Sequence, residues 1–238
     1  MGSPRVRRVV TTRAGGASRG PFNSFNLSDG VGDDPAAVAA NRSRLAATIG
    51  LAADSVVWMR QVHGTDVSVV TGPTDEVVAG VDALVTDRPG LALAVLAADC
   101  VPVLLADPLA GVLGVAHAGR VGASKGVVPS VLAAMADLGA RPERTEVLLG
   151  PAVCGGCYEV PAQMRDDVHG LLPGSGGVTR DGSPGLDLRR GLRVQLRSLN
   201  VIKVDVDPRC TVEDAQLYSH RREGRTGRLA AVTWLDPR

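Results

Sequence analysis

Three residues that could bind a metal, or act as nucleophile and base, lie where apolar runs of the sequence end. In the segment "LAADCVPVLLADPLAGVLGVAHAGR", Cys100 lies between two apolar runs that are typical of buried strands, and His117 lies near the end of the next one. His63 lies at a turn between two other apolar runs. Protein scaffolds present functional groups at such places. If these ends converge, one thiolate and two imidazoles form a three-ligand set, which in catalytic zinc sites leaves a fourth position for water or substrate.

These three residues also have an ordinary structural interpretation. A cysteine in an apolar strand often behaves as a small hydrophobic residue, and a single histidine is usually a hydrogen-bonded surface or core residue. The dispersed spacing of His63, Cys100 and His117 matches no compact zinc motif. The spacing alone therefore leaves both interpretations open.

A second cysteine pattern, "CGGC" at residues 154–157, has the CxxC spacing of metal and redox motifs. Its only further thiol partners are Cys100 and Cys210, and no second CxxC exists, so the pattern does not indicate a zinc ribbon. The two glycines after "LLGPAV" favour a tight turn at a strand end that lines a pocket, with the cysteines incidental.

Two segments could bind an anion. In "TTRAGG", Arg13 stands beside a glycine pair after an apparent strand, which can form a nest of backbone N–H groups, although no Walker or GxGxxG spacing is present. The segment "SHRREGRTGR", residues 219–228, concentrates four arginines. Its two interpretations, a solvated basic loop and an anion-binding segment, stay open.

The elements that must position these residues are mostly strands. Residues 100–108 and 111–119 predict a hairpin that turns through Pro108–Gly111, and residues 173–185 predict a flexible surface loop. Asp34 and Pro35 predict the start of a helix that ends at Gly50. One further predicted strand begins at residue 9, and two more lie within residues 55–70. The remaining predicted strands span residues 81–87, 91–98, 145–153, 201–207 and 228–235. The other predicted helices span residues 125–139, 161–172 and 189–199. Because many strands are consecutive, we expect a mixed α+β layered domain.

Composition excludes several function classes. With 26 basic and 25 acidic residues and 3% aromatic residues, the chain offers neither the charge nor the stacking surface that binding of nucleic acid or of a membrane surface needs. The N-terminus lacks the apolar run of a secretory signal, and the apolar run Leu91–Ala98 is too short to span a membrane. Four cysteines are too few for a disulfide scaffold. We therefore expect a soluble cytoplasmic protein with reduced thiols.

Several motif blocks together resemble one known family. The blocks "TTRAGG", "RQVHGTDV", "AADCVPVLLADP", "GVAHAGR", "GPAVCGGCYEV" and "YSHRREGRTGR" occur in this order from about Arg13 to the C-terminus. They closely resemble the YfiH-like or laccase-domain family, which is named after multicopper polyphenol oxidases and includes purine nucleoside phosphorylases and a peptidoglycan editing factor. The family usually continues "HAG" with Trp-Arg-Gly, whereas this chain has Arg120, Val121 and Gly122, which puts the substrate preference in doubt.

The resemblance implies a fold and a site. The fold is an α+β, layered α/β/β/α sandwich of mixed sheets, similar to the catalytic domains of Cys-His toxin deamidases, in one catalytic domain of residues 1–238. The implied metal is zinc, with copper as the alternative. The implied zinc ligands are His63, Cys100 and His117, and catalytic roles fall on Cys100, His117 and Asp99. The candidate substrate contacts are Arg13, Asn26, Gln61, Tyr158 and Arg221, for several of which a structural role is an equal alternative.

The resemblance favours a zinc-dependent purine nucleoside phosphorylase with an adenosine deaminase side activity. Its partners would be purine nucleosides (adenosine, inosine, guanosine, methylthioadenosine) and phosphate, and it would be a monomer or a homodimer. The alternative is an amidase that edits peptidoglycan precursors of the UDP-muramoyl amino acid type; a protein whose zinc is purely structural is a third. A copper polyphenol oxidase is less favoured, because the chain has four histidines and no His-x-His pair.

Overall fold

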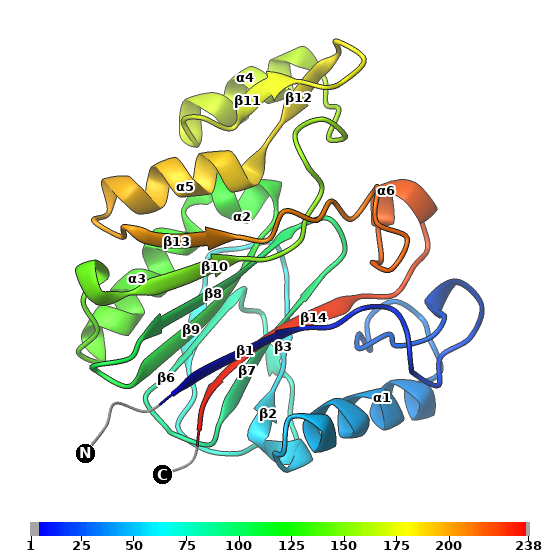
Figure 1. Ribbon diagram of the computed structural model, residues 1–238, viewed down its shortest axis with the longest axis vertical. Helices are drawn as coiled ribbons and strands as arrows, with labels where there is room; N and C mark the ends of the chain where they lie inside the picture. The colour runs from blue at the N-terminus through cyan, green and yellow to red at the C-terminus, as the bar shows by residue number, and fades with distance from the viewer. Residues whose placement is uncertain (1–4, 237–238) are drawn as a thin grey trace.

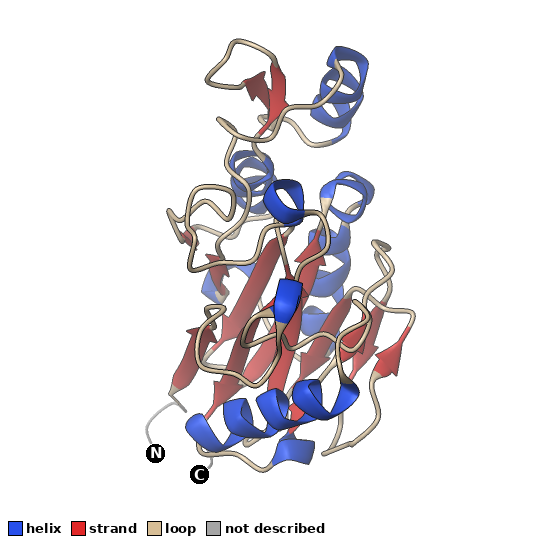
Figure 2. Ribbon diagram, turned by 90° about the vertical axis from the view of Figure 1, so that its right-hand side faces the viewer, coloured by secondary structure: helices blue, strands red, loops and turns tan. Residues whose placement is uncertain are grey.

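Two stacked β-sheets with helices on both outer faces make up the computed structural model, which describes residues 5–236 (Figures 1 and 2). The first sheet has the order β1 (Val6–Val10), β14 (Leu229–Leu235), β7 (Ala92–Ala97) and β2 (Val56–Val57). The second has the order β13 (Lys203–Val206), β10 (Glu146–Leu149), β8 (Val101–Asp107), β9 (Val112–Ala118), β6 (Ala83–Thr86) and β4 (Val67–Val69). Parallel pairs occur in both sheets, so both are mixed.

Two small sheets and the helices complete the described fold. The small sheets pair β3 (Met59–Arg60) with β5 (Val78–Ala79) and β11 (Gly176–Val178) with β12 (Pro184–Leu186). The α-helices are α1 (Pro35–Thr48), α2 (Arg120–Lys125), α3 (Val127–Asp137), α4 (Ala162–Leu171), α5 (Leu188–Ser198) and α6 (His220–Glu223). Short 3-10 helices are η1 (Gly20–Phe22), η2 (Ala53–Ser55) and η3 (Pro142–Arg144). None of the helices within residues 5–236 combines the length and the apolar composition that crossing a membrane requires.

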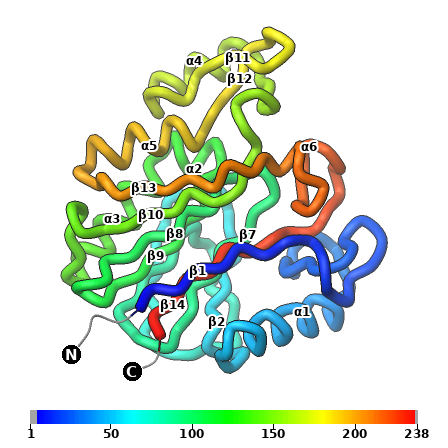
Figure 3. Tube along the Cα trace, in the orientation of Figure 1, coloured from blue at the N-terminus to red at the C-terminus, as the bar shows by residue number. Residues whose placement is uncertain are grey.

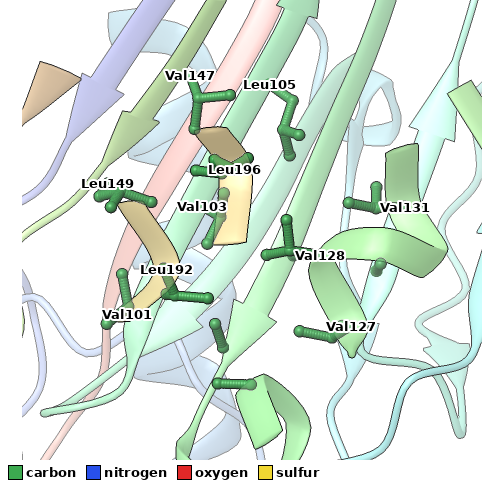
Figure 4. Packing of buried hydrophobic residues seen from close by; sticks show 14 of the residues in the cluster. Val101, Val103, Leu105, Val127, Val128, Val131, Val147, Leu149, Leu192 and Leu196 are labelled. Carbon is green, nitrogen blue, oxygen red and sulfur yellow. The ribbon is translucent and has the colours of Figure 1, made fainter. Parts of the chain in front are cut away.

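Strand β8 shows how the apolar sequence produces the layers. Its alternating residues face two different cores: Val103 and Leu105 pack toward helices α3 and α5 (Figure 4), whereas Leu104 packs against the other sheet. A strand that is buried on both faces reads as a continuous apolar run rather than an alternating one. Full burial of each such side chain contributes roughly 1.5–3 kcal/mol to the free energy of folding. The side chains of β8 therefore stabilise its packing against the helices and against the other sheet.

The helices also pack on the sheets through apolar contacts. Helix α1 covers the first sheet, where Leu45 packs with Trp58 and Val232. Helix α3 packs on β9 at Gly114, where a Cβ atom would lie 2.8 Å from the Met135 sulfur, so a glycine lets helix and strand approach. The first and last strands, β1 and β14, run side by side as an antiparallel pair (Figure 3). The predicted α/β/β/α sandwich of mixed sheets is confirmed; the likeness to toxin deamidases stays a prediction.

Most predicted elements are confirmed, including the hairpin through Pro108–Gly111 and the helix between Asp34 and Gly50. The prediction for residues 173–185 was wrong: this segment contains the β11–β12 hairpin, which turns between Thr179 and Ser183. Its glycines carry no side-chain pattern that could mark a strand, and the pairing rests on backbone hydrogen bonds. Helix α2 was also missed, because Gly126 in a left-handed conformation separates it from α3.

Candidate functional site

The structure brings His63, Cys100 and His117 together. Cys100 directly precedes β8 and His117 is the penultimate residue of β9, and these two strands pair antiparallel with Pro102 opposite His117. The turn between β3 and β4 carries His63 to the same place. The metal-binding atoms of the three residues lie within 4.8 Å of one another, with 4.0 Å between His63 Nε2 and Cys100 Sγ.

A buried carboxylate, Asp82, holds both histidines. It accepts a hydrogen bond of 2.8 Å from Nδ1 of His117. It also accepts bonds from the backbone N–H groups of Val62, His63 and Gly64 at 3.0, 3.0 and 2.6 Å, which fix the turn that carries His63. His63 itself has a φ of 60°, in the left-handed region where non-glycine residues are strained, and such strain is typical of functional sites. Asp82 therefore orients one ligand through its ring and the other through its backbone.

Asp99 was predicted to have a catalytic role, but the carboxylate that contacts His117 in the structure is that of Asp82. The Asp99 carboxylate accepts bonds of 2.6 Å from the Thr211 hydroxyl and 2.6 Å from the Arg221 backbone N–H. It lines the cavity beside Cys100 and contacts neither histidine through a hydrogen bond. Asp82 carried one usable signal, an acidic residue directly before the buried run of β6.

Cys100 and His117 stabilise each other's charged forms. Burial raises the pKa of the Cys100 thiol, but the positive charge of His117 and hydrogen bonds from both histidines outweigh it and lower the pKa to about 6. Burial also lowers the pKa of His117, but the Cys100 thiolate and the bond to Asp82 outweigh it and raise the pKa to about 9. At neutral pH the metal-free site is thus a thiolate beside an imidazolium, and metal binding would release the His117 proton.

The donor set fits zinc. One thiolate and two imidazoles suit this ion, and the bond from His117 Nδ1 to Asp82 leaves Nε2 for a metal. The space beside the donors requires a glycine: a Cβ atom on Gly119 would lie 2.9 Å from His63 Cδ2 and 3.0 Å from Cys100 Sγ. With three donors, the set has a fourth direction for a substrate or water.

A cavity of about 910 Å³ lies at the fourth position of the donor set, and His63, Cys100 and His117 line it. This volume lies within the usual range for small-molecule sites. Four arginines line the same cavity, and Asp29 and Asp99 are the acidic residues there; the arginines are Arg60, Arg120, Arg221 and Arg228. A surplus of guanidinium groups suits an anionic group such as phosphate.

Three of the five predicted substrate contacts line the cavity. They are Gln61, Tyr158 and Arg221. The Arg221 guanidinium lies 5.1 Å from the centre of the Tyr158 ring, so the two form one wall. Both ends of the Gln61 amide bond the backbone of Leu96, at 2.8 and 2.9 Å, which ties the His63 turn to β7.

The other two predicted contacts, Arg13 and Asn26, do not line the cavity. Arg13 pairs with Glu223 at 2.8 Å and lies over the Tyr218 ring. Asn26 is fully buried and accepts a 2.9 Å bond from the backbone N–H of Arg228. Both therefore support the loops that form the cavity wall.

The basic segment 219–228 divides into two kinds of arginine. Arg221 and Arg228 line the cavity. Arg222 instead bonds backbone carbonyls, including that of Leu217 at 2.6 Å, and Arg225 bonds the Gly32 carbonyl. The departure from the family pattern also lies at the cavity: Arg120, the first residue of α2, places a cation where the family usually has tryptophan.

Comparisons with known proteins agree with these motifs. A family model described as "Multi-copper polyphenol oxidoreductase laccase" matches residues 7–236. A protein of Mycobacterium tuberculosis (strain ATCC 25618 / H37Rv), named purine nucleoside phosphorylase, is 57% identical over 234 residues, which cover 98% of this chain and 94% of that protein. A protein of Corynebacterium glutamicum with the same name is 56% identical, covering 97% and 94% of the two chains.

Solved structures show the same fold. YlmD from Geobacillus stearothermophilus superimposes with a TM-score of 0.90 at 36% identity, covering 98% of this chain and 92% of that one. The hypothetical protein YfiH of Bacillus licheniformis gives a TM-score of 0.89 at 30% identity, covering 97% and 92%. The chain therefore belongs to the laccase-like YfiH family that its motifs predict.

Proposed function

We propose that this chain is a zinc-dependent purine nucleoside phosphorylase, which cleaves nucleosides such as adenosine, inosine, guanosine and methylthioadenosine with phosphate to give the free base and ribose-1-phosphate. One observation carries the proposal: the set of His63, Cys100 and His117 opens onto a cavity lined by four arginines. Relatives that are 56% and 57% identical over nearly the whole chain bear this name. We assign the activity to one catalytic domain of residues 1–238.

The arginines supply the binding of phosphate. Of the four in the cavity, Arg228 is half-buried, and the charges of Cys100 and Asp99 act on it against the effect of burial, which lowers its pKa. Arg228 is therefore near enough to the donor set for the charge of Cys100 to act on it. Arg221 and Tyr158 offer a flat cationic–aromatic wall that suits a nucleobase or ribose. A phosphate held by these cations near the nucleoside reacts as an intramolecular partner, which is a large part of the expected rate enhancement.

His63, Cys100 and His117 would hold the zinc ion. A zinc ion bound there supplies Lewis-acid stabilisation of negative charge. Asp82 accepts a hydrogen bond from Nδ1 of His117 and so keeps the ring in place, which means that the ring orientation does not depend on the substrate. Zinc deaminases of nucleobases use a related His/Cys donor set, which supports adenosine deamination as a side activity of the same site.

The test is the phosphate dependence of nucleoside turnover. Purified protein with quantified zinc is incubated with inosine and with adenosine, with and without phosphate, and free base, ribose-1-phosphate and inosine are followed. We expect base release that requires phosphate and disappears when a chelator removes zinc. If a folded, zinc-loaded protein releases no base from any purine nucleoside, the proposal is wrong.

A second candidate rests on the Cys100–His117 pair. In the metal-free site the thiolate of Cys100 lies beside a histidine that Asp82 orients, which is the arrangement of a cysteine nucleophile with its base. This supports an amidase that edits peptidoglycan precursors of the UDP-muramoyl amino acid type. Iodoacetamide would alkylate Cys100 of such an amidase and inactivate it, and the amidase would keep its activity without zinc. The phosphorylase would lose its activity when zinc is removed. Metal analysis of the same samples decides between zinc and the alternative, copper.

We also place the protein in the reducing cytoplasm, because none of the cysteines in the described chain forms a disulfide. Labelling of the thiols in intact cells tests this placement. Rapid modification of Cys154 and Cys157 by a membrane-impermeant thiol reagent would contradict it.

A further inference from the structure

A second cluster of metal-binding side chains lies at the "CGGC" turn. The sulfur atoms of Cys154, Cys157 and Cys210 and a carboxylate oxygen of Glu213 all lie within 4.8 Å of one another. Cys157 Sγ is 3.1 Å and Cys154 Sγ 3.8 Å from Glu213 Oε1. The backbone N–H of Cys154 points at Cys210 Sγ over 3.3 Å. Four donors of two chemical types thus converge on one point, separate from the set around His63.

The sheet topology explains why these residues meet. Strands β10 and β13 are parallel neighbours, so the segments that follow them leave the sheet at the same edge and run side by side (Figure 1). A bridge between Ala152 and Cys210 continues this pairing beyond the strands. Cys154 follows β10 and Cys210 follows β13, and the parallel pairing brings them together.

Each half of the cluster is built on one tight turn. In the first, the N–H groups of Cys157 and Tyr158 bond the Cys154 carbonyl at 2.9 and 3.0 Å, which turns both sulfur atoms to the same side. In the second, the N–H of Glu213 bonds the Cys210 carbonyl at 3.1 Å. Donor pairs spaced three residues apart on opposed turns form the usual framework of structural zinc sites.

The surroundings suit an anionic metal–thiolate centre. Arg180, from the turn between β11 and β12, forms an ion pair with Glu213. Its guanidinium also lies 3.7 Å from Cys157 Sγ. Three thiolates and one carboxylate around a divalent cation leave a net negative charge, part of which this guanidinium offsets. Charge-assisted contacts of this kind stabilise both the carboxylate and the metal-bound sulfur.

We propose that Cys154, Cys157, Cys210 and Glu213 form a second, structural zinc site with a closed tetrahedral donor set. Four protein donors leave no position for a substrate, unlike the three donors around His63. The cysteines of "CGGC" are then metal ligands rather than incidental residues of a turn.

The site clamps the wall of the cavity. Val153 and Tyr158, which flank the CGGC turn, both line the cavity. Thr211, between the ligands of the second turn, donates a 2.6 Å bond to Asp99, and the Val153 N–H bonds the Asp99 carbonyl at 3.1 Å. Asp99 directly precedes Cys100, so a metal that joins the two turns fixes the backbone next to the other site.

The first test is metal content. Zinc-supplemented wild-type protein is expected to contain two zinc ions per chain, one for each cluster. Cys154→Ser and Cys100→Ser should each lose one of the two and retain the other. Glu159→Gln, which removes a neighbouring exposed carboxylate outside the cluster, is the matched control and should lose none. A Cys154→Ser protein that is folded and retains the full zinc content of the wild type overturns the proposal, whatever that content is.

A second measurement does not depend on any variant of the three cysteines in the proposed site. Cobalt(II)-substituted wild-type protein is titrated and its thiolate charge-transfer absorption is followed. We expect the absorption of a three-thiolate centre in the wild type and in Cys100→Ser, and a shifted spectrum with weaker cobalt binding in Glu213→Gln, which alters only one exposed ligand. A spectrum with a single thiolate ligand contradicts the site. Mass spectrometry of the unreduced protein that finds a disulfide among Cys154, Cys157 and Cys210 in freshly purified samples also contradicts it.

Discussion

The two clusters of cysteine-containing donors use similar side chains in opposite ways. The cluster around Cys100 has three donors, opens onto a cavity of about 910 Å³ and takes its orientation from the buried Asp82. The cluster around Cys210 has four donors and is covered by the exposed Arg180 through its ion pair with Glu213. The number of donors and the groups that face them, rather than the presence of cysteine, therefore distinguish a reactive site from a structural one.

The largest effect is expected when a ligand is removed from the open cluster. His117→Ala deletes both a donor and the partner of the Cys100 thiolate, and it is expected to lower kcat/KM for phosphorolysis by about 10³-fold or more, on the scale of losing a member of a catalytic unit. The measurement is phosphate-dependent base release from inosine. His169→Ala, on the exposed face of α4 and outside both clusters, is the control and should keep wild-type turnover. Turnover of His117→Ala near that of the control would contradict the assignment.

The next effect separates the two carboxylates near the open cluster. Asp82→Asn weakens the hold on His117 and on the His63 turn, and a loss of roughly 10–100-fold in zinc affinity or turnover is expected. Asp99→Asn should have a smaller effect on zinc affinity, because Asp99 bonds Thr211 and a backbone N–H and contacts neither histidine. Zinc titration with a competing chelator compares the two variants. Equal losses of affinity would remove the distinction between them.

The arginines of the basic segment 219–228 are expected to differ in their effect on phosphate binding. Arg228→Gln removes a cation from the cavity wall near the donor set, and loss of a charged hydrogen bond of about 1.5–3 kcal/mol predicts a rise of roughly tenfold or more in the KM for phosphate. Arg225→Gln, on the same segment but outside the cavity lining, should leave that KM unchanged. Initial rates at varied phosphate concentration give both values. A rise in KM for both variants would mean that the whole segment acts through its net charge.

The smallest effect on chemistry is expected at the closed cluster. Cys154→Ser should lower the free energy of unfolding by about 3–4 kcal/mol when zinc is present at 100 to 1,000 times its Kd, because a ligand that binds only the folded state stabilises it by that amount. Turnover per remaining zinc should fall only a few-fold, on the order of 1 kcal/mol. Thermal unfolding with and without zinc, followed by assay, measures both. A variant with normal stability and no turnover would reverse the roles of the two clusters.

The sequence predicted the layered fold because its apolar runs are long and its turns are marked. The run of β8 and the Pro108–Gly111 turn required no tertiary information. The β11–β12 hairpin did, because it rests on backbone pairing in a glycine-rich segment whose side chains carry no pattern. Helix α2 was missed because Gly126, in a left-handed conformation, separates it from α3.

The site was predicted in part, for a related physical reason. His63, Cys100 and His117 were identified from motif blocks, and the structure brings them together. Asp82 was missed because its role depends on four hydrogen bonds to distant residues, which leave no trace in spacing. The CGGC turn was interpreted without Glu213, whose approach depends on the parallel pairing of β10 and β13. Convergence that depends on pairing between distant strands is the part that sequence patterns do not carry.

The catalytic role of the open cluster is tested most directly by measuring zinc content and phosphate-dependent inosine cleavage on the same samples of wild type, Cys100→Ala and Cys154→Ser. We expect each variant to lose one zinc ion, Cys100→Ala to lose its turnover, and Cys154→Ser to keep most of its turnover. Full turnover by a folded Cys100→Ala protein would contradict the claim that the open cluster is the catalytic one.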